Sequence, residues 1–398
     1  MAQPSPLWIQ VPRPGNHYSP ARGSAIATVI YEFARERFEA GLETRVVLDE
    51  KASCDYPVGQ CQAVNFGPFP RRWKQRCDAR LASWGFRRFW MERFYAPVIK
   101  AIEPDFDGPV FFHDALDAIE EVKRARPRAQ ICLWFHNYKW RGRESGELRR
   151  ILSRVDRIIC VSRFVADALQ RECSHAKAEW NGKICVVHNG VDVNQFRPPE
   201  NASQKQPGDP VIITFAGRII EKKGPHLLLE AAQQLSKTNG GSAPDLQIRI
   251  IGSKSNAPGE ALSPYEKELR HQAASLGNRV EFLPMLDRKT VAQEIRECDI
   301  FCAPALWEEP LGLTILEGMA SGAAVVTTRR GGIPEIGLDA VHYFDLDNPH
   351  SLAEKLQELI QSPEKRRQSG EKARQRALQL TWQASYSALE IALSGRIT

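Results

Sequence analysis

Two glutamates, Glu309 and Glu317, lie eight positions apart in the segment WEEPLGLTILEGMASG, residues 307–322. Proline is favoured in the first turn of a helix, so the segment predicts an apolar-sided helix that begins near Pro310. Eight helical residues turn through about 800°, which would bring both carboxylates to one side of this helix. The free amides of its first turn would bind an anion such as a diphosphate. These amides belong to Leu311, Gly312, Leu313 and Thr314.

The two glutamates beside this anion site indicate a ligand that has hydroxyl groups as well as phosphates. An ionised carboxylate only accepts hydrogen bonds, and its two oxygens suit a pair of neighbouring hydroxyl groups. We therefore expect Glu317 to bind a ribose and Glu309 to bind a hexose. A nucleotide sugar contains all of these parts in one molecule.

Further charged residues lie in GRIIEKKG, residues 217–224, directly after an apolar run that predicts a strand. Glycine at the end of a strand lets the backbone approach a ligand closely. Arg218 and Lys223 are five positions apart on this loop. Two fixed cations stabilise a diphosphate while it is bound and while it departs, so we expect both side chains to bind phosphate.

These segments, with the strand-like run 323–327 and the turn GGIPE at 331–335, resemble the E-x7-E signature of retaining glycosyltransferases of family 4. The resemblance implies the GT-B fold and transfer of a hexose from a nucleotide diphosphate sugar, with UDP favoured over GDP. It also implies a glycan or lipid-linked glycan acceptor, in bacterial polysaccharide or lipopolysaccharide synthesis. The family usually works without a metal ion and needs no protein nucleophile, so we expect no metal site and no cofactor.

The resemblance assigns roles to individual residues of this chain. The expected catalytic residues are His136, Arg218, Lys223 and Glu309. The expected residues of the nucleotide-sugar site are Gly23, Leu283, Gly312, Leu313, Thr314 and Glu317. Within this set, Glu309 would position the hexose, Glu317 the ribose and His136 the reacting end of the donor sugar.

Two of these assignments come from the first half of the chain. His136 follows the apolar run 133–135, at a strand end where the family has a histidine near the donor sugar. His113 ends an earlier strand and is interpreted as structural. Gly23 lies directly before the first predicted helix, where the family has a glycine close to the phosphates, and Gly15 is the second candidate.

Leu283 ends the segment RVEFL, which resembles the strand and loop where the family contacts the nucleobase through backbone groups. The next residue is Pro284, where the family usually has glycine, and this difference weakens the transfer of base contacts. The segment Asp105-Phe106-Asp107 has the DxD form of metal-dependent GT-A enzymes. It does not lie in a predicted GT-B donor site, so we interpret it as a coincidence.

Short apolar runs alternate with amphipathic segments along most of the chain, which is typical of parallel α/β architecture. The runs predict strands at 7–11, 46–48, 110–112, 131–135, 158–161, 184–188, 211–216, 246–251, 280–283, 300–303 and 323–327. We expect two doubly wound, Rossmann-like domains that face each other across a cleft. Ligands of such sheets bind beyond the carboxyl ends of the strands.

The predicted first domain, residues 1–196, would bind the acceptor. A polar, proline-rich linker follows at 197–210, and the nucleotide-sugar-binding domain would occupy 211–380. The resemblance implies that the terminal helix, within 381–398, crosses back and packs on the first domain through Trp382 and Tyr386. A simple cap on the second domain is the alternative.

Charge is distributed unevenly along the 398 residues, whose net charge is +6. Residues 1–197 contain 31 Lys and Arg against 23 Asp and Glu, so the excess of positive charge lies in this half. An anionic partner or a membrane surface is therefore expected for the first half only. The nine scattered cysteines are interpreted as small apolar residues in a reducing cytosol. No apolar run approaches the ~20 residues that span a bilayer, and no secretory signal is recognised, so we expect a cytoplasmic protein.

Residues 69–95 combine eight basic residues with eight aromatic ones, against only Asp78 and Glu92. Basic and aromatic residues together suit anionic lipid headgroups or a lipid-linked phosphorylated acceptor, which would make the protein peripheral on the inner face of the membrane. The alternative is a pair of surface helices that pack their aromatic residues inward. Nucleic acid is not expected as a partner, because no RNA-binding motif accompanies the segment.

Two other functions fit parts of this pattern. The same motifs occur in soluble glucan or disaccharide synthases, against which the segment 69–95 argues mildly. A catalytically silent nucleotide-sugar-binding protein is the second alternative, and the presence of all the expected polar residues argues against it.

Overall fold

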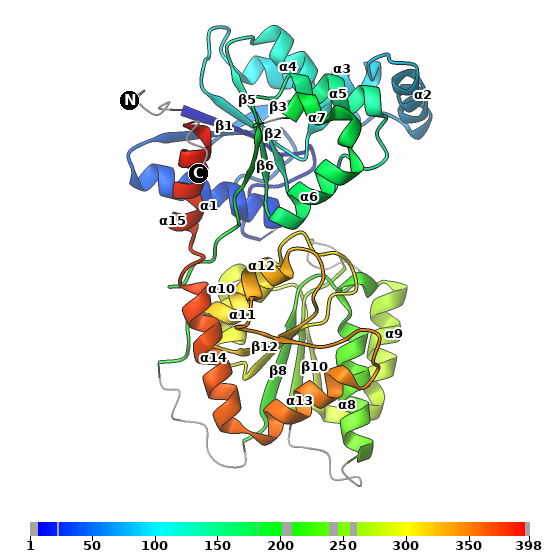
Figure 1. The fold of residues 1–398 in the computed structure, drawn as a ribbon, viewed down its shortest axis with the longest axis vertical. Helices are drawn as coiled ribbons and strands as arrows, with labels where there is room; N and C mark the ends of the chain where they lie inside the picture. The colour runs from blue at the N-terminus through cyan, green and yellow to red at the C-terminus, as the bar shows by residue number, and fades with distance from the viewer. Residues whose placement is uncertain are drawn as a thin grey trace. The chain divides into compact units, whose positions relative to one another are not determined.

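The computed structural model describes residues 7–21, 24–180, 182–200, 209–238, 246–254 and 261–394, and the chain forms two compact units. Unit 1 comprises Met1–His188 and Tyr386–Thr398, and unit 2 comprises Asn189–Ser385. In each unit, helices cover both faces of a central sheet (Figure 1). The prediction of two Rossmann-like α/β domains is confirmed.

Unit 1 contains a seven-stranded parallel sheet with the strand order β3-β2-β1-β4-β5-β6-β7. Its strands are β1 (Leu7–Val11), β2 (Glu43–Asp49), β3 (Gln60–Val64), β4 (Pro109–His113), β5 (Gln130–Phe135), β6 (Arg157–Cys160) and β7 (Ile184–Val186). Its helices are α1 (Ala25–Glu39), α2 (Arg72–Ser83), α3 (Phe89–Tyr95), α4 (Ile119–Ala125), α5 (Ser145–Ser153), α6 (Arg163–Glu172) and α7 (Lys177–Trp180). All residues of the central strand β4 are buried, as expected for a parallel sheet covered on both faces.

Unit 2 contains a six-stranded parallel sheet with the strand order β10-β9-β8-β11-β12-β13. Its strands are β8 (Val211–Ala216), β9 (Leu246–Ile251), β10 (Val280–Leu283), β11 (Ile300–Ala303), β12 (Ala324–Thr327) and β13 (His342–Tyr343). Its helices are α8 (Pro225–Thr238), α9 (Pro264–Ala273), α10 (Arg288–Arg296), α11 (Leu313–Ala320), α12 (Ile333–Gly337), α13 (Ser351–Gln361) and α14 (Pro363–Ala377). The first strand, β8, lies inside the sheet, and the strand order reverses beside it. Ligands of such sheets bind in the crevice that this reversal leaves at the carboxyl ends of the strands.

The last helix, α15 (Trp382–Leu393), begins in unit 2 and continues into unit 1 from Tyr386 onward. In unit 1, the ring of Tyr386 lies 5.8 Å from that of Trp8, and the guanidinium of Arg157 donates to the carbonyl of Ala392 at 3.0 Å. In unit 2, a Cβ on Gly190 would lie 2.3 Å from the backbone nitrogen of Trp382. The two ends of α15 are therefore packed closely, each against its own unit.

Unit 2 begins earlier in the chain than the predicted linker at 197–210. The guanidinium of Arg374 on α14 donates to the carbonyls of Val193 and Phe196 at 3.0 and 2.8 Å. These bonds attach the segment that precedes the linker to unit 2. Residues 201–208 of the predicted linker lie outside the described residues.

The interpretation of all nine cysteines as free thiols is wrong for two of them. Cys54, in the connection between β2 and β3, forms a disulfide with Cys61 of β3. The two sulfurs meet because Tyr18 forms a parallel bridge with Cys54 and because β3 lies beside β2 with Cys61 opposite Val46. The other seven cysteines are free, and five of these are buried. Among the described residues, the structure contains no helix with the length and hydropathy needed to traverse a bilayer.

Candidate functional site

The helix predicted near Pro310 begins three residues later, at Leu313. Gly312 precedes it with a φ of 103°, a backbone conformation that favours glycine. Glu309 therefore lies in the loop before α11, and the prediction that eight helical residues separate Glu309 from Glu317 is wrong. In the first turn, the amides of Ile315 and Leu316 donate to the carbonyl of Gly312 at 3.1 and 3.3 Å.

Two backbone amides of this first turn are free to bind an anion, as predicted for this helix. The described residues provide no acceptor for the amides of Leu313 and Thr314, which form the positive end of α11. The N-terminus of this eight-residue helix carries a partial positive charge that attracts an anion. The anion site predicted at Gly312, Leu313 and Thr314 is thus compatible with the observed helix, although the helix is shorter.

The side chain of Glu309 binds two donors from different parts of unit 2. One oxygen, Oε2, accepts from Nζ of Lys223 at 2.6 Å and from Nε1 of Trp307 at 2.7 Å. The described residues provide no partner for the other oxygen, Oε1. The carboxylate is therefore fixed by one oxygen, and the second is available to a ligand hydroxyl.

The backbone of Glu309 is fixed by the turn that follows β12. The amide of Gly332 donates to the carbonyl of Glu309 at 2.8 Å. Gly331 has a φ of 60°, and a Cβ there would lie 2.0 Å from that carbonyl oxygen. Only glycine fits this contact, which explains the first glycine of the sequence GGIPE.

Lys223 reaches Glu309 because the loop after β8 turns sharply. Lys223 ends a short 3-10 turn, and Gly224 follows with a φ of 72°, where a Cβ would lie 2.0 Å from the carbonyl oxygen of Pro304. The amide of Leu306 also donates to the carbonyl of Lys222 at 2.9 Å. Two loops that are 86 residues apart are thus joined, and the expected catalytic pair Lys223 and Glu309 lies together. Arg218 is exposed on the first of these loops.

Glu317 is 5% exposed on α11, and its partner is a residue that the sequence analysis missed. Nη1 of Arg288, the first residue of α10, lies 3.1 Å from Oε1 of Glu317. Burial raises the pKa of Glu317, and the positive charge of Arg288 acts in the opposite direction. The available signal was the position of Arg288, a basic residue shortly after the carboxyl end of β10.

Arg288 has unused hydrogen-bonding capacity. Its Nε and Nη2 atoms are buried and have no hydrogen-bond partner, and its guanidinium lies 5.1 Å from the ring centroid of Phe196. A guanidinium has five N–H donors, so most of them are not satisfied by Glu317 alone. The pair of Arg288 and Glu317 therefore offers both donors and acceptors to a ligand.

Leu283 lies at the carboxyl edge of the sheet, as predicted, beside two glycines. Its carbonyl accepts from the amide of Gly252 at 3.1 Å, and a Cβ on Gly252 would lie 2.1 Å from the carbonyl oxygen of Gly217. The strand ends of β8, β9 and β10 therefore approach each other closely here. Gly23, the remaining expected residue of the nucleotide-sugar site, lies outside the described residues.

His136 directly follows β5 in unit 1 and belongs to a buried chain of hydrogen bonds. Its Nε2 lies 2.8 Å from Nδ1 of His113, and Nε2 of His113 lies 2.6 Å from Oε1 of Gln10. Burial lowers the pKa of His136 to about 3, and it also lowers the pKa of His113. Both rings are therefore neutral near pH 7, and His113 contacts the expected catalytic histidine directly.

Asp114 fixes the backbone at His136, and the sequence analysis did not single it out. It has a φ of 54°, and its carboxylate accepts from the amide of His136 at 3.0 Å and from the side chain of Asn137 at 3.3 Å. Burial raises the pKa of Asp114 to about 6. Positive φ in a residue other than glycine is uncommon and occurs often at functional sites.

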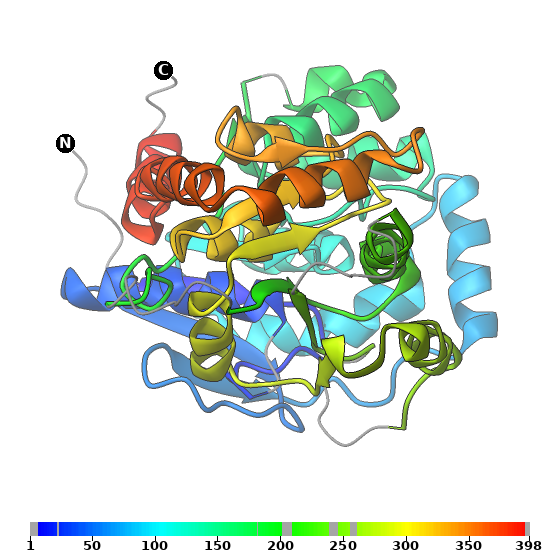
Figure 2. The ribbon, with the colours of Figure 1, turned by 90° about the horizontal axis from the view of Figure 1, so that it is seen from below.

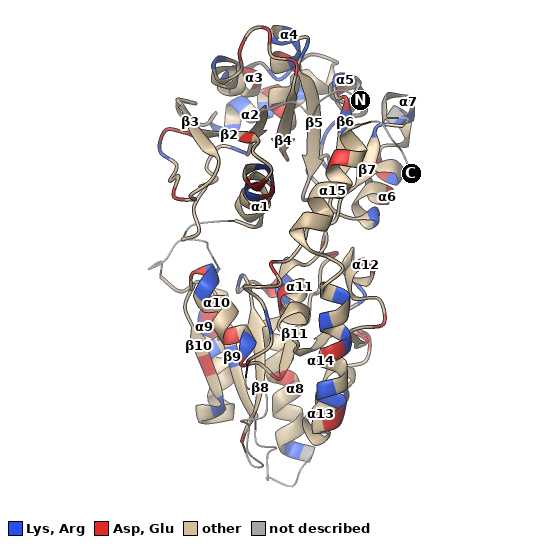
Figure 3. Cartoon of the chain, turned by 90° about the vertical axis from the view of Figure 1, so that its left-hand side faces the viewer, with Lys and Arg blue, Asp and Glu red and all other residues tan. Residues whose placement is uncertain are grey.

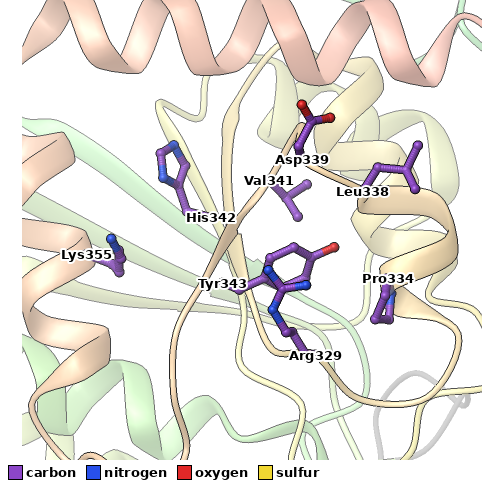
Figure 4. Close-up of a pocket in the computed structure, with 8 residues that line it drawn as sticks. All are labelled: Arg329, Pro334, Leu338, Asp339, Val341, His342, Tyr343 and Lys355. Carbon is purple, nitrogen blue, oxygen red and sulfur yellow. The ribbon is translucent and has the colours of Figure 1, made fainter.

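Unit 2 also has an open cavity of about 780 Å³ beside β13, and Figure 4 shows the side chains that line it. They are Arg329, Pro334, Leu338, Asp339, Val341, His342, Tyr343 and Lys355. The guanidinium of Arg329 lies 4.0 Å from the ring centroid of Tyr343. The only carboxylate, Asp339, is exposed and paired with Lys372, so this cavity lacks the buried acceptors that a sugar would need.

Within the described part of the chain, no group of three or more His, Cys, Asp or Glu side chains is arranged to bind a metal ion. For a phosphate, this part of unit 2 offers the cationic side chains and the helix amides described above. An anionic ligand with hydroxyl groups suits these residues, which provide two free amides, two glutamates and the cations Arg218, Lys223 and Arg288.

Two family models match the chain and together cover most of it. Residues 26–195 match the model described as Glycosyltransferase Family 4, and residues 196–376 match the model described as Glycosyl transferases group 1. With the two Rossmann-like units, these matches place the chain among the glycosyltransferases of the GT-B fold, to which it belongs.

Individual proteins resemble the chain at modest identity. Spore coat protein SA of Bacillus subtilis is 28% identical over 65% of this chain and 70% of its own length. A D-inositol 3-phosphate glycosyltransferase of Streptomyces avermitilis is 30% identical over 61% of this chain and 52% of its own length. The chain thus matches only part of each relative.

Among solved structures, the sucrose-phosphate synthase of Thermosynechococcus elongatus has a TM-score of 0.73 at 20% identity, with 98% of both chains covered. HepE of Anabaena in complex with UDP-glucose has a TM-score of 0.71 at 18% identity, covering 97% of this chain and 99% of HepE. At such identities these structures establish the fold alone.

Proposed function

We propose that this protein transfers a hexose from a nucleotide diphosphate sugar to a glycan or lipid-linked glycan, with retention of the anomeric configuration and without a metal ion. The observation that supports this proposal most is the contact of Lys223 with Glu309 beside the free amides of α11. A cation, a partly free carboxylate and a helix terminus together match a sugar diphosphate better than they match either part alone.

The donor diphosphate would bind the two cations Arg218 and Lys223 and the amides of Leu313 and Thr314. Its negative charge competes with Glu309 for Lys223, so binding would release the carboxylate to accept hydrogen bonds from the hexose. These groups neutralise the charge that develops on the departing diphosphate, which is the role a metal ion has in other transferases. The proposal therefore requires no metal.

The ribose of the nucleotide would bind Glu317, whose charge Arg288 balances. Burial raises the pKa of Glu317, whereas the ion pair favours the ionised form that accepts hydroxyl hydrogen bonds. A UDP-sugar is the favoured donor. HepE, a structural neighbour of the same fold, was crystallised with UDP and with UDP-glucose, and this supports the choice of nucleotide.

In the proposed reaction, the bond between the hexose anomeric carbon and the diphosphate oxygen breaks as the acceptor hydroxyl oxygen attacks from the same face. The hydroxyl proton passes to the departing phosphate oxygen, so no protein nucleophile or base is needed. His136 would act as a neutral hydrogen-bonding group toward the hexose or the acceptor, because burial lowers its pKa to about 3. Exclusion of water would protect the donor from hydrolysis.

We propose a bacterial polysaccharide or lipopolysaccharide precursor as the acceptor, and action in the cytoplasm on the inner face of the membrane. A lipid-linked acceptor remains in the bilayer, so the enzyme would have to approach that surface. The exposed basic and aromatic residues of the segment 69–95 support this setting.

The test is to incubate the protein in EDTA with UDP-glucose, UDP-galactose or GDP-mannose and a mixture of lipid-linked glycan precursors. Proton NMR then identifies the consumed donor and the configuration of the new linkage. The proposal predicts consumption of a UDP-sugar and a product with the anomeric configuration of the donor. An inverted product, or a strict requirement for a divalent cation, would contradict it.

A further inference from the structure

Five aromatic side chains from the segment 69–95 project into solvent. They are Phe69, Trp73, Trp84, Phe86 and Phe89, and each is between 52% and 63% exposed. They make up half of the ten large apolar side chains that are exposed in the described part of the molecule. The alternative that the aromatic residues of this segment pack inward holds for Phe94 and Tyr95, which are buried, and fails for these five.

Four of the eight basic residues of the same segment are exposed on or next to α2. Arg71 precedes α2, and Arg72, Arg76 and Arg80 are exposed on the helix itself. Trp73, Arg80 and Trp84 have the spacing i, i+7, i+11, which places them along one side of a helix. The guanidinium of Arg80 also lies 5.3 Å from the ring centroid of Trp84. We call these nine residues, five aromatic and four basic, the basic–aromatic surface.

Both carboxylates of the segment point inward. Asp78 is fully buried and accepts from the backbone amides of Trp90 and Met91 at 3.2 and 2.9 Å, in the first turn of α3. Glu92 is buried and lies 3.2 Å from Arg87. The negative charges of the segment are thus used internally, and the outward charge is positive.

The charged residues of α14 in unit 2 differ from those of α2, because some of them form ion pairs with one another. Both signs of charge occur along α14 (Figure 3), and Arg367 pairs with Glu364 and Glu371 at 2.8 and 2.6 Å. On α2, by contrast, none of Arg72, Arg76 and Arg80 forms an ion pair with a described residue. Their charges remain available to an external partner.

The exposed aromatic residues are presented by a backbone that is firmly anchored. Arg150 on α5 donates to the carbonyls of Gly85 and Phe86 at 3.0 and 3.3 Å, while it also binds Glu120 at 2.9 Å. Arg88 forms a bidentate pair with Glu147 at 2.6 and 3.0 Å. Both views place α2 at the outer margin of unit 1 (Figure 1, Figure 2).

We propose that the basic–aromatic surface docks on an anionic lipid bilayer. Trp and Phe insert between lipid headgroups, and arginine side chains bind the headgroup phosphates around them. The arginines stand among the aromatic residues, whereas the buried core of a protein interface is depleted in charge. A role of this contact in reaching a lipid-linked acceptor rests on the proposed function, but the contact itself requires no sugar or nucleotide.

The test measures sedimentation of the 398-residue protein with sucrose-loaded vesicles, without donor or acceptor. The vesicles consist of phosphatidylcholine alone or of phosphatidylcholine with phosphatidylglycerol. We expect binding only to the vesicles that contain phosphatidylglycerol, and loss of binding in 1 M salt, where the Debye length falls to about 3 Å. Equal binding to both vesicle types, or binding to neither, would overturn the proposal.

Substitutions locate the contact. The double variant Trp84→Ala/Phe86→Ala should weaken partitioning about tenfold or more, because it removes two inserting rings. Arg72→Ser, Arg76→Ser and Arg80→Ser should each weaken it about fivefold, the factor that corresponds to about 1 kcal/mol per charge. Phe38→Ala is the matched control, because Phe38 is 66% exposed in the same unit and lies outside this surface. Circular dichroism of each variant confirms that it is folded.

Three outcomes would replace the bilayer by another explanation. Equal loss in Phe38→Ala would show that any exposed ring contributes. A dimer in light scattering that Trp84→Ala/Phe86→Ala abolishes would identify a second copy as the partner. Tighter binding of single-stranded RNA than of vesicles at the same salt would identify nucleic acid. Binding of UDP to the same variants, measured without lipid, should be unchanged, which separates this test from a failure of the proposed function.

Discussion

The candidate groups in the two units differ in charge, although both lie at the carboxyl ends of parallel strands. In unit 2, Lys223 pairs with Glu309 and Arg288 pairs with Glu317. In unit 1, Gln10, His113 and His136 form a chain of hydrogen bonds in which burial keeps both histidines neutral. Paired charges rearrange when an anion arrives, whereas a buried neutral chain keeps its geometry. Under the proposed function, the ion pairs of unit 2 would therefore rearrange when the donor binds, whereas the buried histidine chain of unit 1 would stay fixed.

The largest effect is expected from Glu309→Gln and Lys223→Ala. Each removes one charge of the Lys223–Glu309 ion pair, in which the donor diphosphate is proposed to replace Glu309 as the partner of Lys223. Each should lower kcat about 10²- to 10³-fold, as the loss of a preorganised electrostatic contact does in other enzymes. Lys222→Ala is the matched control, since Lys222 is exposed on the same turn and should leave kcat nearly unchanged. Initial rates with a saturating donor measure the effect. An equal loss in the control would show that the loop, and not the cation, is needed.

Arg288→Met should destabilise unit 2 by about 3 kcal/mol, because it leaves the Glu317 carboxylate buried without its cation. The loss of stability should be larger near pH 8 than near pH 5. A carboxyl whose pKa is raised in the folded state loses stability as pH rises from its unfolded pKa, about 4.3, through its folded pKa. Denaturant titrations at both pH values measure this. If Arg288→Met/Glu317→Leu restores stability but not donor binding, the ion pair serves the ligand.

Gly331→Ala tests whether the turn after β12 positions Glu309. The added Cβ would lie 2.0 Å from the carbonyl oxygen of Glu309, so the loop that contains Glu309 must move. We expect kcat to fall about tenfold or more, since small misplacements of catalytic groups have large effects. Gly277→Ala is the control, because Gly277 has a φ of 59° but no atom within 4 Å of an added Cβ. Equal kinetic effects of the two substitutions would contradict the positioning role.

The smallest effect is expected for a change of pH on His136 in unit 1, whose ring should not titrate between about pH 5 and 8. With its pKa lowered to about 3, the ring remains neutral throughout this range. The nitrogen chemical shifts of ¹⁵N-labelled His136 should therefore stay constant. Folding stability should nevertheless fall as pH drops below about 6.5, because the unfolded histidines then take up protons that the folded ones refuse. Titration of His136 near pH 6.5 would show that the histidine chain is not neutral.

Much of the fold could be predicted from apolar runs, because central strands of a parallel sheet are buried on both faces. The run 211–216 is β8 as predicted, and the run 131–135 lies within β5. Two strands at the edges of the sheets were missed, because an edge strand is less buried and needs no continuous apolar run. In β3, QCQAV, only Val64 is buried, and β13 has just two residues, so neither has an apolar run.

The site was less predictable, since it depends on loop geometry. The residue types of Lys223 and Glu309 suggested a shared ligand, but their contact depends on the turn at Gly224 and on bonds between distant loops. The positive φ of Gly312 delays α11, and no local pattern distinguished it from a helical residue. Arg288 was missed because its partner is 29 positions away along the chain, and only the packing of α10 against α11 brings them together.

The most direct test of the account is calorimetric titration of the protein with UDP, once in EDTA and once in excess Mg²⁺. The account predicts the same dissociation constant in both buffers, and binding about tenfold or more weaker in Lys223→Ala, which lacks a charge-assisted phosphate contact. Binding that appears only with Mg²⁺, or that Lys223→Ala leaves unchanged, would contradict the claim that cations and helix amides of unit 2 bind the diphosphate.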